Sequence, residues 1–441
     1  MQKISLMLPK PQLKTEILAG VSTFLATMYI IVVNPAILSQ SGMSFNGVLT
    51  ATVLLSFFSS LMMGIYAKNP IIVAPGMGMN AFFTFTAVKG MGISWQVALG
   101  AVFWAGVLFL LLSVFNIRSQ IVKAIPKPLR YAISAGIGLF ITLIGFANAK
   151  FIVANPATIL GITSLHDPII ITFLIGLAVT MILLVKRVQG GIIIGILLTT
   201  FLAIPIGRLW GDASAVNFGQ KTLVTWQGIF AAPDFSLLFQ LDIVNSLKIS
   251  LIPIIFAFVF TDLFDSLSTF VGVAEAADLY DADGEPRNIK QSLLTDAVAT
   301  TLAGLLGTSP GTAYIESAVG ISQGGRTGIT AITAGLLFLP FMFLSPLLGI
   351  IPAIATAPAL IVVGVLMIKP ITKINWDKLD DAIPAFLAMV LIPFTYSITQ
   401  GIIWGFLAWT VIKIATNQSK EVSWMLIIID IFALWALYLG H

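Results

Sequence analysis

The segments VAPGMGMNAFF (Val73 to Phe83) and GTSPGTAYIES (Gly307 to Ser317) each place a proline-glycine pair inside a long apolar region of the sequence. Each segment is followed, after a short glycine-containing stretch, by an apolar run of helix length. Pro75-Gly76 and Pro310-Gly311 lie 235 residues apart. Because proline and glycine interrupt helices, these matched pairs predict two broken helices at corresponding positions of a duplicated chain.

A second match supports the duplication. The stretch AIPKPLRYAI (Ala124 to Ile133) is similar to IIPAIATAPAL (Ile350 to Leu360), which follows about 226 residues later. The longest hydrophilic connection lies between the two halves. We therefore divide the chain into a first repeat, an extracytoplasmic connection, a second repeat and a C-terminal tail with an apolar segment, which cover residues 1–207, 208–247, 248–416 and 417–441.

The composition indicates an integral membrane protein. The 441 residues are 58% hydrophobic and only 10% charged, whereas an ordinary soluble domain is about 25% charged. Apolar runs long enough to cross roughly 30 Å of hydrocarbon recur from Ile17 onward. The first run extends past Val33 without a small-residue cleavage site, so we expect it to stay as the first membrane span.

The apolar runs predict fourteen membrane spans, seven in each repeat. Because seven is odd, the second repeat must cross the membrane in the opposite direction, which is the inverted-repeat plan of many secondary transporters. The predicted fold is therefore an all-α polytopic membrane protein in which spans 3 and 10 are broken. The predicted spans are 17–38, 47–66, 71–88, 93–115, 128–147, 168–186, 190–207, 248–271, 289–306, 309–323, 328–350, 355–371, 381–397 and 400–415.

The basic residues predict the orientation. With the N-terminus inside, 18 of the 23 Lys and Arg residues fall in inner segments, in agreement with the positive-inside rule. We therefore expect a multi-pass protein of the plasma membrane, the bacterial inner membrane, with a cytoplasmic N-terminus. This topology accounts for the net charge of +4 without nucleic acid as a partner. The outer basic residues are Lys89, Lys150, Arg208, Lys221 and Lys248.

One apolar segment does not fit the fourteen-span plan. The stretch VSWMLIIIDIFALWALYLG (Val422 to Gly440) is long enough to span, but it carries Asp430 and would place the C-terminus outside. We interpret this segment as a peripheral or interfacial helix.

Cysteine and histidine are scarce. The chain has no cysteine, which excludes disulfides and thiolate metal sites, and its two histidines are His166 and His441. We therefore expect neither a metal centre nor another cofactor.

The two interruptions suit ligand binding. A freed backbone inside a membrane is tolerated where it is buried in protein or lines a cavity. Helical stretches predicted at Asn80 to Val88 and Ile315 to Ile321 would point their N-termini toward the midplane. Their N–H groups and positive dipole ends would favour an anionic or carbonyl-bearing ligand. The alternative is that both interruptions are packing kinks.

Three carboxylates accompany these interruptions. In FVFTDLFDSLSTFVG (Phe258 to Gly272), Asp262 and Asp265 share a helix face with Ser266 and Thr269. An Asp at the centre of a membrane helix costs roughly 2.5 to 3.5 kcal/mol, so this pair must face protein or water. Glu316 follows the second interruption. Close carboxylates can bind a polar ligand and exchange a proton.

Structural alternatives exist for each acidic residue. Asp262 and Asp265 could form an internal hydrogen-bonded pair that caps a helix junction. Glu316 could stabilise a helix N-terminus. Asp296 lies early in a predicted span and is interpreted as structural, and the run Glu275 to Arg287 is interpreted as a solvated inner loop.

The motifs APGMGMNAFF, FTDLFDSLSTFVG and GTSPGTAYIESAVGISQGGRTG, taken in order, resemble the nucleobase/ascorbate transporter superfamily, specifically its AzgA-like branch of hypoxanthine, guanine and adenine permeases. The similarity covers nearly the whole chain. It implies a core of spans 1–4 and 8–11 (17–115 and 248–350) and a gate of spans 5–7 and 12–14 (124–207 and 351–416). It also implies proton symport and often a homodimer.

The resemblance also assigns roles to individual residues. Asp262 and Glu316 look like the principal purine-binding carboxylates, and relatives specific for uracil or xanthine usually carry Glu where this chain has Asp262. Asp265 joins these two as a proton-coupling candidate. Aromatic side chains are candidates for stacking on the flat ring. The remaining candidate substrate contacts are Gly78, Asn80, Phe82, Phe83, Phe258, Ala313 and Tyr314.

The predicted function is proton-coupled purine uptake, with guanine and hypoxanthine ranked before adenine on family frequency. An anion transporter of the same architecture is disfavoured, because three acidic groups would repel an anion. An intramembrane aspartyl protease needs aspartates on separate helices, and a purely structural membrane protein needs no matched broken helices. Sodium stays open as a coupling ion, because carboxylates and unwound carbonyls could coordinate it.

Overall fold

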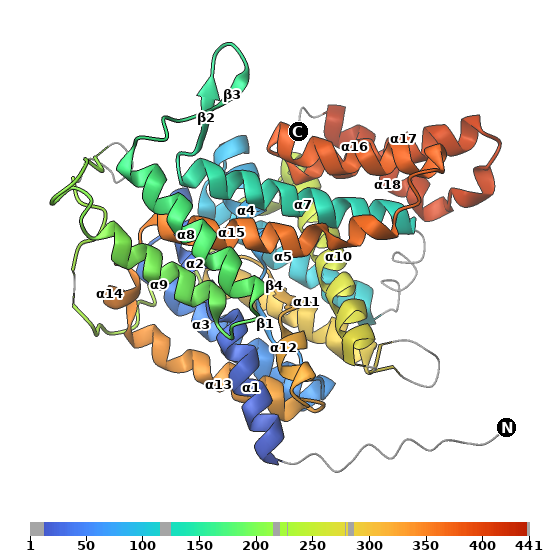
Figure 1. The fold of residues 1–441 in the computed structure, drawn as a ribbon. Helices are drawn as coiled ribbons and strands as arrows, with labels where there is room; N and C mark the ends of the chain where they lie inside the picture. The colour runs from blue at the N-terminus through green and yellow to red at the C-terminus, as the bar shows by residue number, and fades with distance from the viewer. Residues whose placement is uncertain are drawn as a thin grey trace.

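The structure, a computed structural model, describes residues 13–114, 125–214, 221–226, 228–277, 279–280 and 286–438 (Figure 1). Several predicted inner segments lie in part outside the described residues, including the N-terminus, the link before Pro126 and the loop Glu275 to Arg287.

Helices dominate both halves of the chain. The first half contains α1 (Leu13–Thr27), α2 (Ile30–Leu38), α3 (Phe45–Met62), α4 (Met77–Ala81), α5 (Trp95–Val114), α7 (Lys127–Asn148), α8 (Pro168–Val185) and α9 (Gly191–Ala203), with π-helices η2 (Met63–Ala67) and η3 (Phe82–Gly90). The second half contains α10 (Ile252–Ala277), α11 (Ile289–Leu306), α12 (Ser317–Ser322), α13 (Gly328–Phe338), α14 (Ser345–Leu348), α15 (Ala353–Ile368), α16 (Leu379–Thr395), α17 (Ile398–Ala415) and α18 (Trp424–Tyr438).

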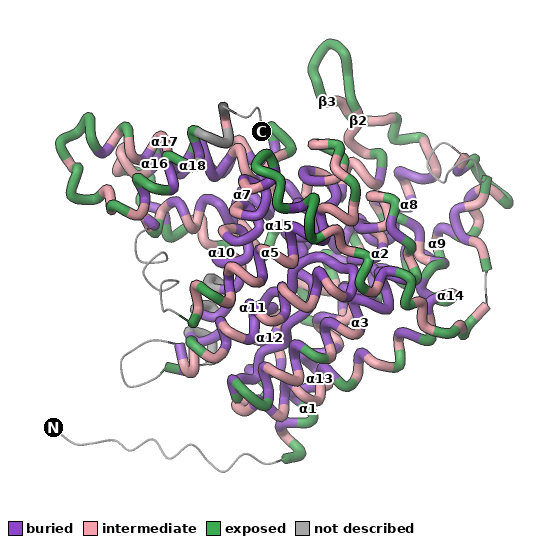
Figure 2. The backbone as a smooth tube through the Cα atoms, turned by 180° about the vertical axis from the view of Figure 1, so that it is seen from behind, coloured by how far each residue is buried: buried purple, intermediate pink, exposed green. Residues whose placement is uncertain are grey.

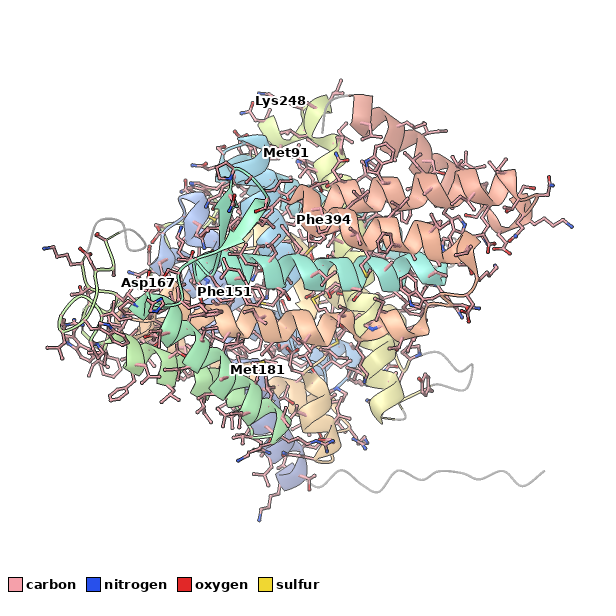
Figure 3. The ribbon with its side chains drawn as sticks, turned by 45° about the horizontal axis from the view of Figure 1, so that its top comes forward. Met91, Phe151, Asp167, Met181, Lys248 and Phe394 are labelled. Atoms are coloured by element: carbon pink, nitrogen blue, oxygen red, sulfur yellow. The ribbon has the colours of Figure 1, made fainter. Side chains whose placement is uncertain are left out.

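The helices identify a multi-pass membrane protein. Among the described residues, seven helical segments are long and apolar enough to cross a membrane. Large apolar side chains point away from the protein on the outer helices, as a lipid-facing surface requires; Met181 on α8 and Phe394 on α16 are examples (Figure 3). The spanning segments are 13–41, 45–67, 95–114, 127–148, 168–185, 353–373 and 398–415. The total of fourteen spans stays a prediction.

The first predicted span, 17–38, is divided in the structure. Helix α1 ends at Thr27 and α2 begins at Ile30, so Tyr29 lies in the break. The Thr27 hydroxyl donates to the carbonyls of Thr23 and Phe24, at 2.9 and 3.2 Å. Such back-bonding competes with the backbone ladder and bends helices. The sequence analysis did not predict this break.

The two interruptions meet as a short antiparallel pair of strands, β1 (Val73–Pro75) and β4 (Gly311–Ala313). Val73 pairs with Ala313 and Pro75 with Gly311. All six residues are buried. A single extended segment in an apolar bundle would leave its N–H and C=O groups unpaired, and each interruption satisfies the other. The all-α prediction holds for the helices and misses these strands.

Glycine makes the close approach of the interruptions feasible. The N–H of Gly76 donates to the carbonyl of Pro310 at 2.9 Å, which extends the pairing by one residue. A Cβ atom at Gly76 would lie 2.7 Å from the Thr312 hydroxyl oxygen. Any larger residue at position 76 would therefore clash with the Thr312 side chain.

Helices of the two halves pack in matching pairs. Helix α7 lies along α15 (Figure 1), and α5 packs on α11 while α3 packs on α13. Helices α8 and α9 pack on each other, as α16 and α17 do. The interior of this bundle is buried, whereas the hairpin of β2 (Ile152–Asn155) and β3 (Ile159–Ile162) projects from it and is mostly exposed (Figure 2).

The C-terminal helix α18 packs against α17 and α10. The Thr410 hydroxyl of α17 donates to the Asp430 carboxylate at 2.5 Å, so the acidic residue faces protein. Nearby, the buried Lys413 ammonium contacts Asp380, Asp381 and Glu421 at 2.6 to 2.7 Å. This ion-pair cluster fixes the chain that leads from α17 into α18.

Candidate functional site

The two aspartates of α10 face different partners. Asp262 is almost completely buried, with 1% of its surface exposed, and its Oδ2 accepts a hydrogen bond of 2.6 Å from the Thr300 hydroxyl of α11. Thr300 also donates to the carbonyl of Gly311 in β4, at 3.3 Å. Asp262 therefore lies behind the second interruption, where it is enclosed by α10, α11 and β4.

Asp265 lies three residues further along the same helix and is half-buried. Its carboxylate accepts from the hydroxyl of Thr312 in β4 and interacts electrostatically with Asp296 and Glu316. Asp296, on α11, is fully buried and accepts from the Ser266 hydroxyl at 2.7 Å. Asp296 thus connects α10 to α11, beside the predicted site residues.

Glu316 lies between β4 and α12, directly before the first residue of the half-helix. It is half-buried, and its Oε1 accepts a hydrogen bond of 2.8 Å from the Tyr29 hydroxyl. Sequence reasoning missed Tyr29. A single tyrosine within an apolar first span was the available signal, but nothing in the local sequence shows that it reaches a residue 287 positions later.

Tyr314 completes the second interruption. Its hydroxyl donates to the carbonyl of Pro75, and its buried ring lies close enough to Glu316 and Asp265 to interact electrostatically with both. Ala313, three residues before Glu316, is buried in the strand pair. We call Tyr29, Asp265, Thr312, Tyr314 and Glu316 the carboxylate-hydroxyl cluster.

The first interruption contributes neutral groups. Asn80 is fully buried, and its Oδ1 accepts a hydrogen bond of 2.6 Å from the Ser309 hydroxyl. Ser309 also donates to Asn34 Oδ1 at 3.4 Å. Asn34 in turn donates to Thr52 and Thr308, at 2.7 and 2.8 Å. Asn80 therefore links the first interruption to Ser309, which directly precedes the proline-glycine pair of the second. Through Asn34 the same network reaches α2 and α3.

Gly78 and the predicted stacking residues lie beside this network. A Cβ atom at Gly78 would come within 2.7 Å of the Ile137 side chain, so Gly78 is where α4 approaches α7. The rings of Phe82 and Phe258 contact each other edge to face, with centroids 4.7 Å apart. Both rings are fully buried, as Phe83 is.

The chemistry of the cluster is that of hydrogen bonding. Two carboxylates supply acceptors and three hydroxyls supply donors, close to the N-terminus of α12. Carboxylates accept strongly from N–H groups of a ligand, and the hydroxyls can donate or accept. Within the described ranges, no three acidic or histidine side chains converge in a way that could hold a metal ion.

Long apolar helices, interruptions that pair inside the bundle and an enclosed polar cluster define a membrane transporter. A family model described as the permease family matches residues 14–404. The chain therefore belongs to this family, the nucleobase/ascorbate transporters, as its motifs predict.

Several curated relatives carry the names of purine substrates, and two of them are described here. The chain is 41% identical over 418 residues to the adenine permease AdeP of Escherichia coli (strain K12), with 94% of this chain and 91% of that protein covered. It is 38% identical over 423 residues to the guanine/hypoxanthine permease PbuO of Bacillus subtilis (strain 168), with 95% and 96% covered.

Solved structures of other transporters share the fold. The transmembrane domain of the cyanobacterial bicarbonate transporter BicA is similar with a TM-score of 0.63 at 16% identity, covering 89% of this chain and 97% of that one. The structure of SLC26A9 is similar with a TM-score of 0.63 at 12% identity, covering 92% and 65%. At these identities the likeness concerns the fold alone.

Proposed function

We propose that this protein is a proton-coupled purine nucleobase permease that takes up guanine and hypoxanthine across the bacterial inner membrane, with its N-terminus in the cytoplasm. The observation that carries this proposal is the carboxylate-hydroxyl cluster, which places Asp265 and Glu316 beside the start of α12. The relatives named as purine permeases support the substrate class.

The site suits the edge of a purine. Adjacent ring N–H groups would donate to carboxylates, and backbone N–H groups at a half-helix would donate to the 6-oxo group. The partial exposure of Asp265 and Glu316 supports them as the carboxylates that meet the ligand first. Asp262 would line the side of the site that lies behind β4. Phe82 and Phe258 would lie along the flat face of the purine ring.

Transport would proceed by alternating access of a core against a gate. The matched helix pairs, such as α7 with α15, support an inverted repeat of seven spans. Motion would concentrate at the proline segments 126–128 and 352–358. One contact between core and gate is a hydrogen bond of 3.1 Å that the Thr86 hydroxyl donates to the carbonyl of Tyr396. The ring of Tyr396 also contacts Phe140 of α7.

A cross-link would test this movement, because cysteines can be placed freely in a chain that has none. Cysteines at Thr86 and Tyr396, joined by a short cleavable reagent, should stop uptake, and cleavage of the reagent should restore it. Full uptake by the cross-linked protein would contradict a gate that moves at this contact.

Adenine is the second candidate substrate, because the adenine permeases AdeP and AdeQ are 41% and 39% identical to this chain. An anion substrate is the remote alternative, because a bicarbonate transporter shares the fold. Two half-buried carboxylates would repel an anion. The proposed assembly is a homodimer, which the mass of the detergent-solubilised protein would test.

The deciding experiment is uptake of radiolabelled hypoxanthine in cells that lack their own purine permeases. Expression of this protein should produce uptake that unlabelled guanine and hypoxanthine inhibit more strongly than adenine. Stronger inhibition by adenine would reassign the substrate within the purines. Absence of uptake of any purine, with the protein present in the membrane, would contradict the proposed function.

A further inference from the structure

Tyr29 is a buried member of the carboxylate-hydroxyl cluster to which the proposed transport mechanism gives no role of its own. Only 1% of its surface is exposed, and its hydroxyl donates to Glu316 Oε1 at 2.8 Å. Tyr29 belongs to the first half of the chain, and its hydrogen-bond partner Glu316 belongs to the second. A buried phenol needs a hydrogen-bond partner, and here the partner is the carboxylate that precedes the half-helix α12.

Tyr29 lies at the junction of α1 and α2, and its own backbone is right-handed helical. The carbonyl of Tyr29 accepts from the N–H groups of both Val32 and Val33, at 3.1 and 3.0 Å. The bond from Val33 is the regular helical one, and the bond from Val32 is the shorter-range bond of a tightened turn. The ring of Tyr29 therefore reaches Glu316 from a tightened turn of the first span.

Helix α1 is also fastened to α12 and α13. The Ser22 hydroxyl donates to Gln323 Oε1 at 2.5 Å. A Cβ atom at Gly320 would lie only 2.1 Å from the Thr23 hydroxyl oxygen, so the two helices touch. The Glu16 carboxylate accepts from the backbone N–H of Arg326 at 3.0 Å. These contacts hold α1 against the half-helix that follows Glu316.

The titratable groups around Glu316 come from each neighbouring segment. Tyr29 comes from the break between α1 and α2, Tyr314 from the end of β4 and Asp265 from α10, with Asp296 of α11 beside Asp265. Tyr29 is the described hydroxyl that bonds directly to the Glu316 carboxylate. Tyr314 instead donates to a backbone carbonyl.

We propose that Tyr29 is a positioning residue for Glu316, whose hydroxyl holds the carboxylate in the orientation that receives the purine. The inference rests on the proposed function of the cluster. A hydrogen bond to an ionised acceptor is among the stronger ones, and it restricts the rotamers of the long glutamate side chain. One carboxylate oxygen is thereby committed to Tyr29, and the ligand meets a carboxylate that is already oriented.

Substitution of Tyr29 by Phe tests this role, because Phe keeps the ring and removes one oxygen atom. Tyr29→Phe should raise the KM of purine uptake about tenfold or more, as expected for a lost bond to a charged group, and leave the maximal rate within about twofold. The pH profile of uptake should shift toward higher pH, because the ionised carboxylate loses a hydrogen bond. The control is Tyr66→Phe at an exposed tyrosine of η2, which should behave as wild type.

A double substitution separates positioning from folding. Tyr29→Phe added to Glu316→Ala should raise KM no further than Glu316→Ala alone, because the side chain that Tyr29 positions is then absent. Additive losses, an unchanged pH profile in Tyr29→Phe, or failure of that variant to accumulate in the membrane would each overturn the proposal. Wild-type protein that transports no purine would instead contradict the proposed function.

Discussion

The two interruptions share a backbone and differ in chemistry. Each places three extended residues against the other and then starts a short helix, α4 or α12. From Val73 to Val88 the first interruption has no ionisable side chain, and its amide, Asn80, is fully buried. The second carries Tyr314 and Glu316, and Glu316 is half-buried.

This difference shows how a duplicated chain can divide one site between its copies. Both copies must supply strand pairing, because neither backbone could be satisfied alone. The carboxylates are needed once, and both Glu316 and Asp265 lie on the second copy. The first interruption should therefore be sensitive to side-chain volume, whereas the second should be sensitive to charge.

The largest effect is expected behind the second interruption. Asp262→Asn should abolish purine uptake driven by an inward proton gradient, because Asn can still accept from the Thr300 hydroxyl but cannot cycle a proton. Asp265→Asn should chiefly weaken affinity or shift the pH optimum. The measurement is uptake into proteoliposomes with a proton or a sodium gradient imposed separately.

The control for these variants is Asp212→Asn in the exposed connection, which should leave uptake unchanged. Full proton-driven uptake by Asp262→Asn would reject its assignment as a proton carrier. Acceleration by sodium alone would replace the proton as the coupling ion.

A large effect is also expected at Glu316 itself. Glu316→Gln should weaken purine affinity about 10- to 150-fold or more, because a charged acceptor in an enclosed site is lost. The protein should still reach the membrane, because the Tyr29 hydroxyl can donate to the amide oxygen. Affinity is measured by binding of labelled hypoxanthine to purified protein. Near-normal binding would show that the two interruptions do not differ as proposed.

A moderate effect is expected at Gly78, where the first interruption approaches α7. Gly78→Ala should slow uptake several-fold, because its Cβ atom would lie 2.7 Å from the Ile137 side chain. Ile137→Ala in the same protein should restore the rate by removing the clash. If the double variant stays slow, the glycine is required for another reason, such as approach of the ligand to the backbone.

The smallest effect on affinity is expected for Asn80→Ala. This change removes the acceptor of the Ser309 hydroxyl and should lower the free energy of unfolding by about 1 to 3 kcal/mol. The KM for purine should change by less than about threefold, since Asn80 contacts Ser309 and Met77 within the protein framework. Melting temperature and uptake kinetics measure the two quantities. A loss of affinity comparable to that of Glu316→Gln would make Asn80 a direct ligand contact.

Much of the helical frame could be predicted from the sequence. Apolar run length located helices such as α11 to within a residue, and the proline-glycine pairs located both interruptions. The pairing of β1 with β4 could not be predicted, because a Pro-Gly pair shows where a helix stops and not which distant backbone completes it. The break at Tyr29 depends on local hydroxyl bonds that apolar periodicity does not report.

The candidate site was predicted in part. Asp262 and Asp265 are three residues apart, which on a helix leaves about 60° between their directions. That angle is enough to turn Asp262 toward Thr300 of α11 and Asp265 toward Thr312 of β4. The cost of a lipid-facing carboxylate therefore predicted that the pair faces protein or water, but only the packing of α10 could distinguish the two residues.

The strand pair also constrains how the protein is made. Val73 and its partner Ala313 are separated by 240 positions, so β1 leaves the ribosome long before β4 exists. Until the second repeat is inserted, the buried backbone of the first interruption has no permanent partner. Closure of this contact is a late, long-range step in assembly. Neither half of the chain can satisfy its own interrupted backbone. Two half-length chains synthesised together would therefore have to associate before either became stable.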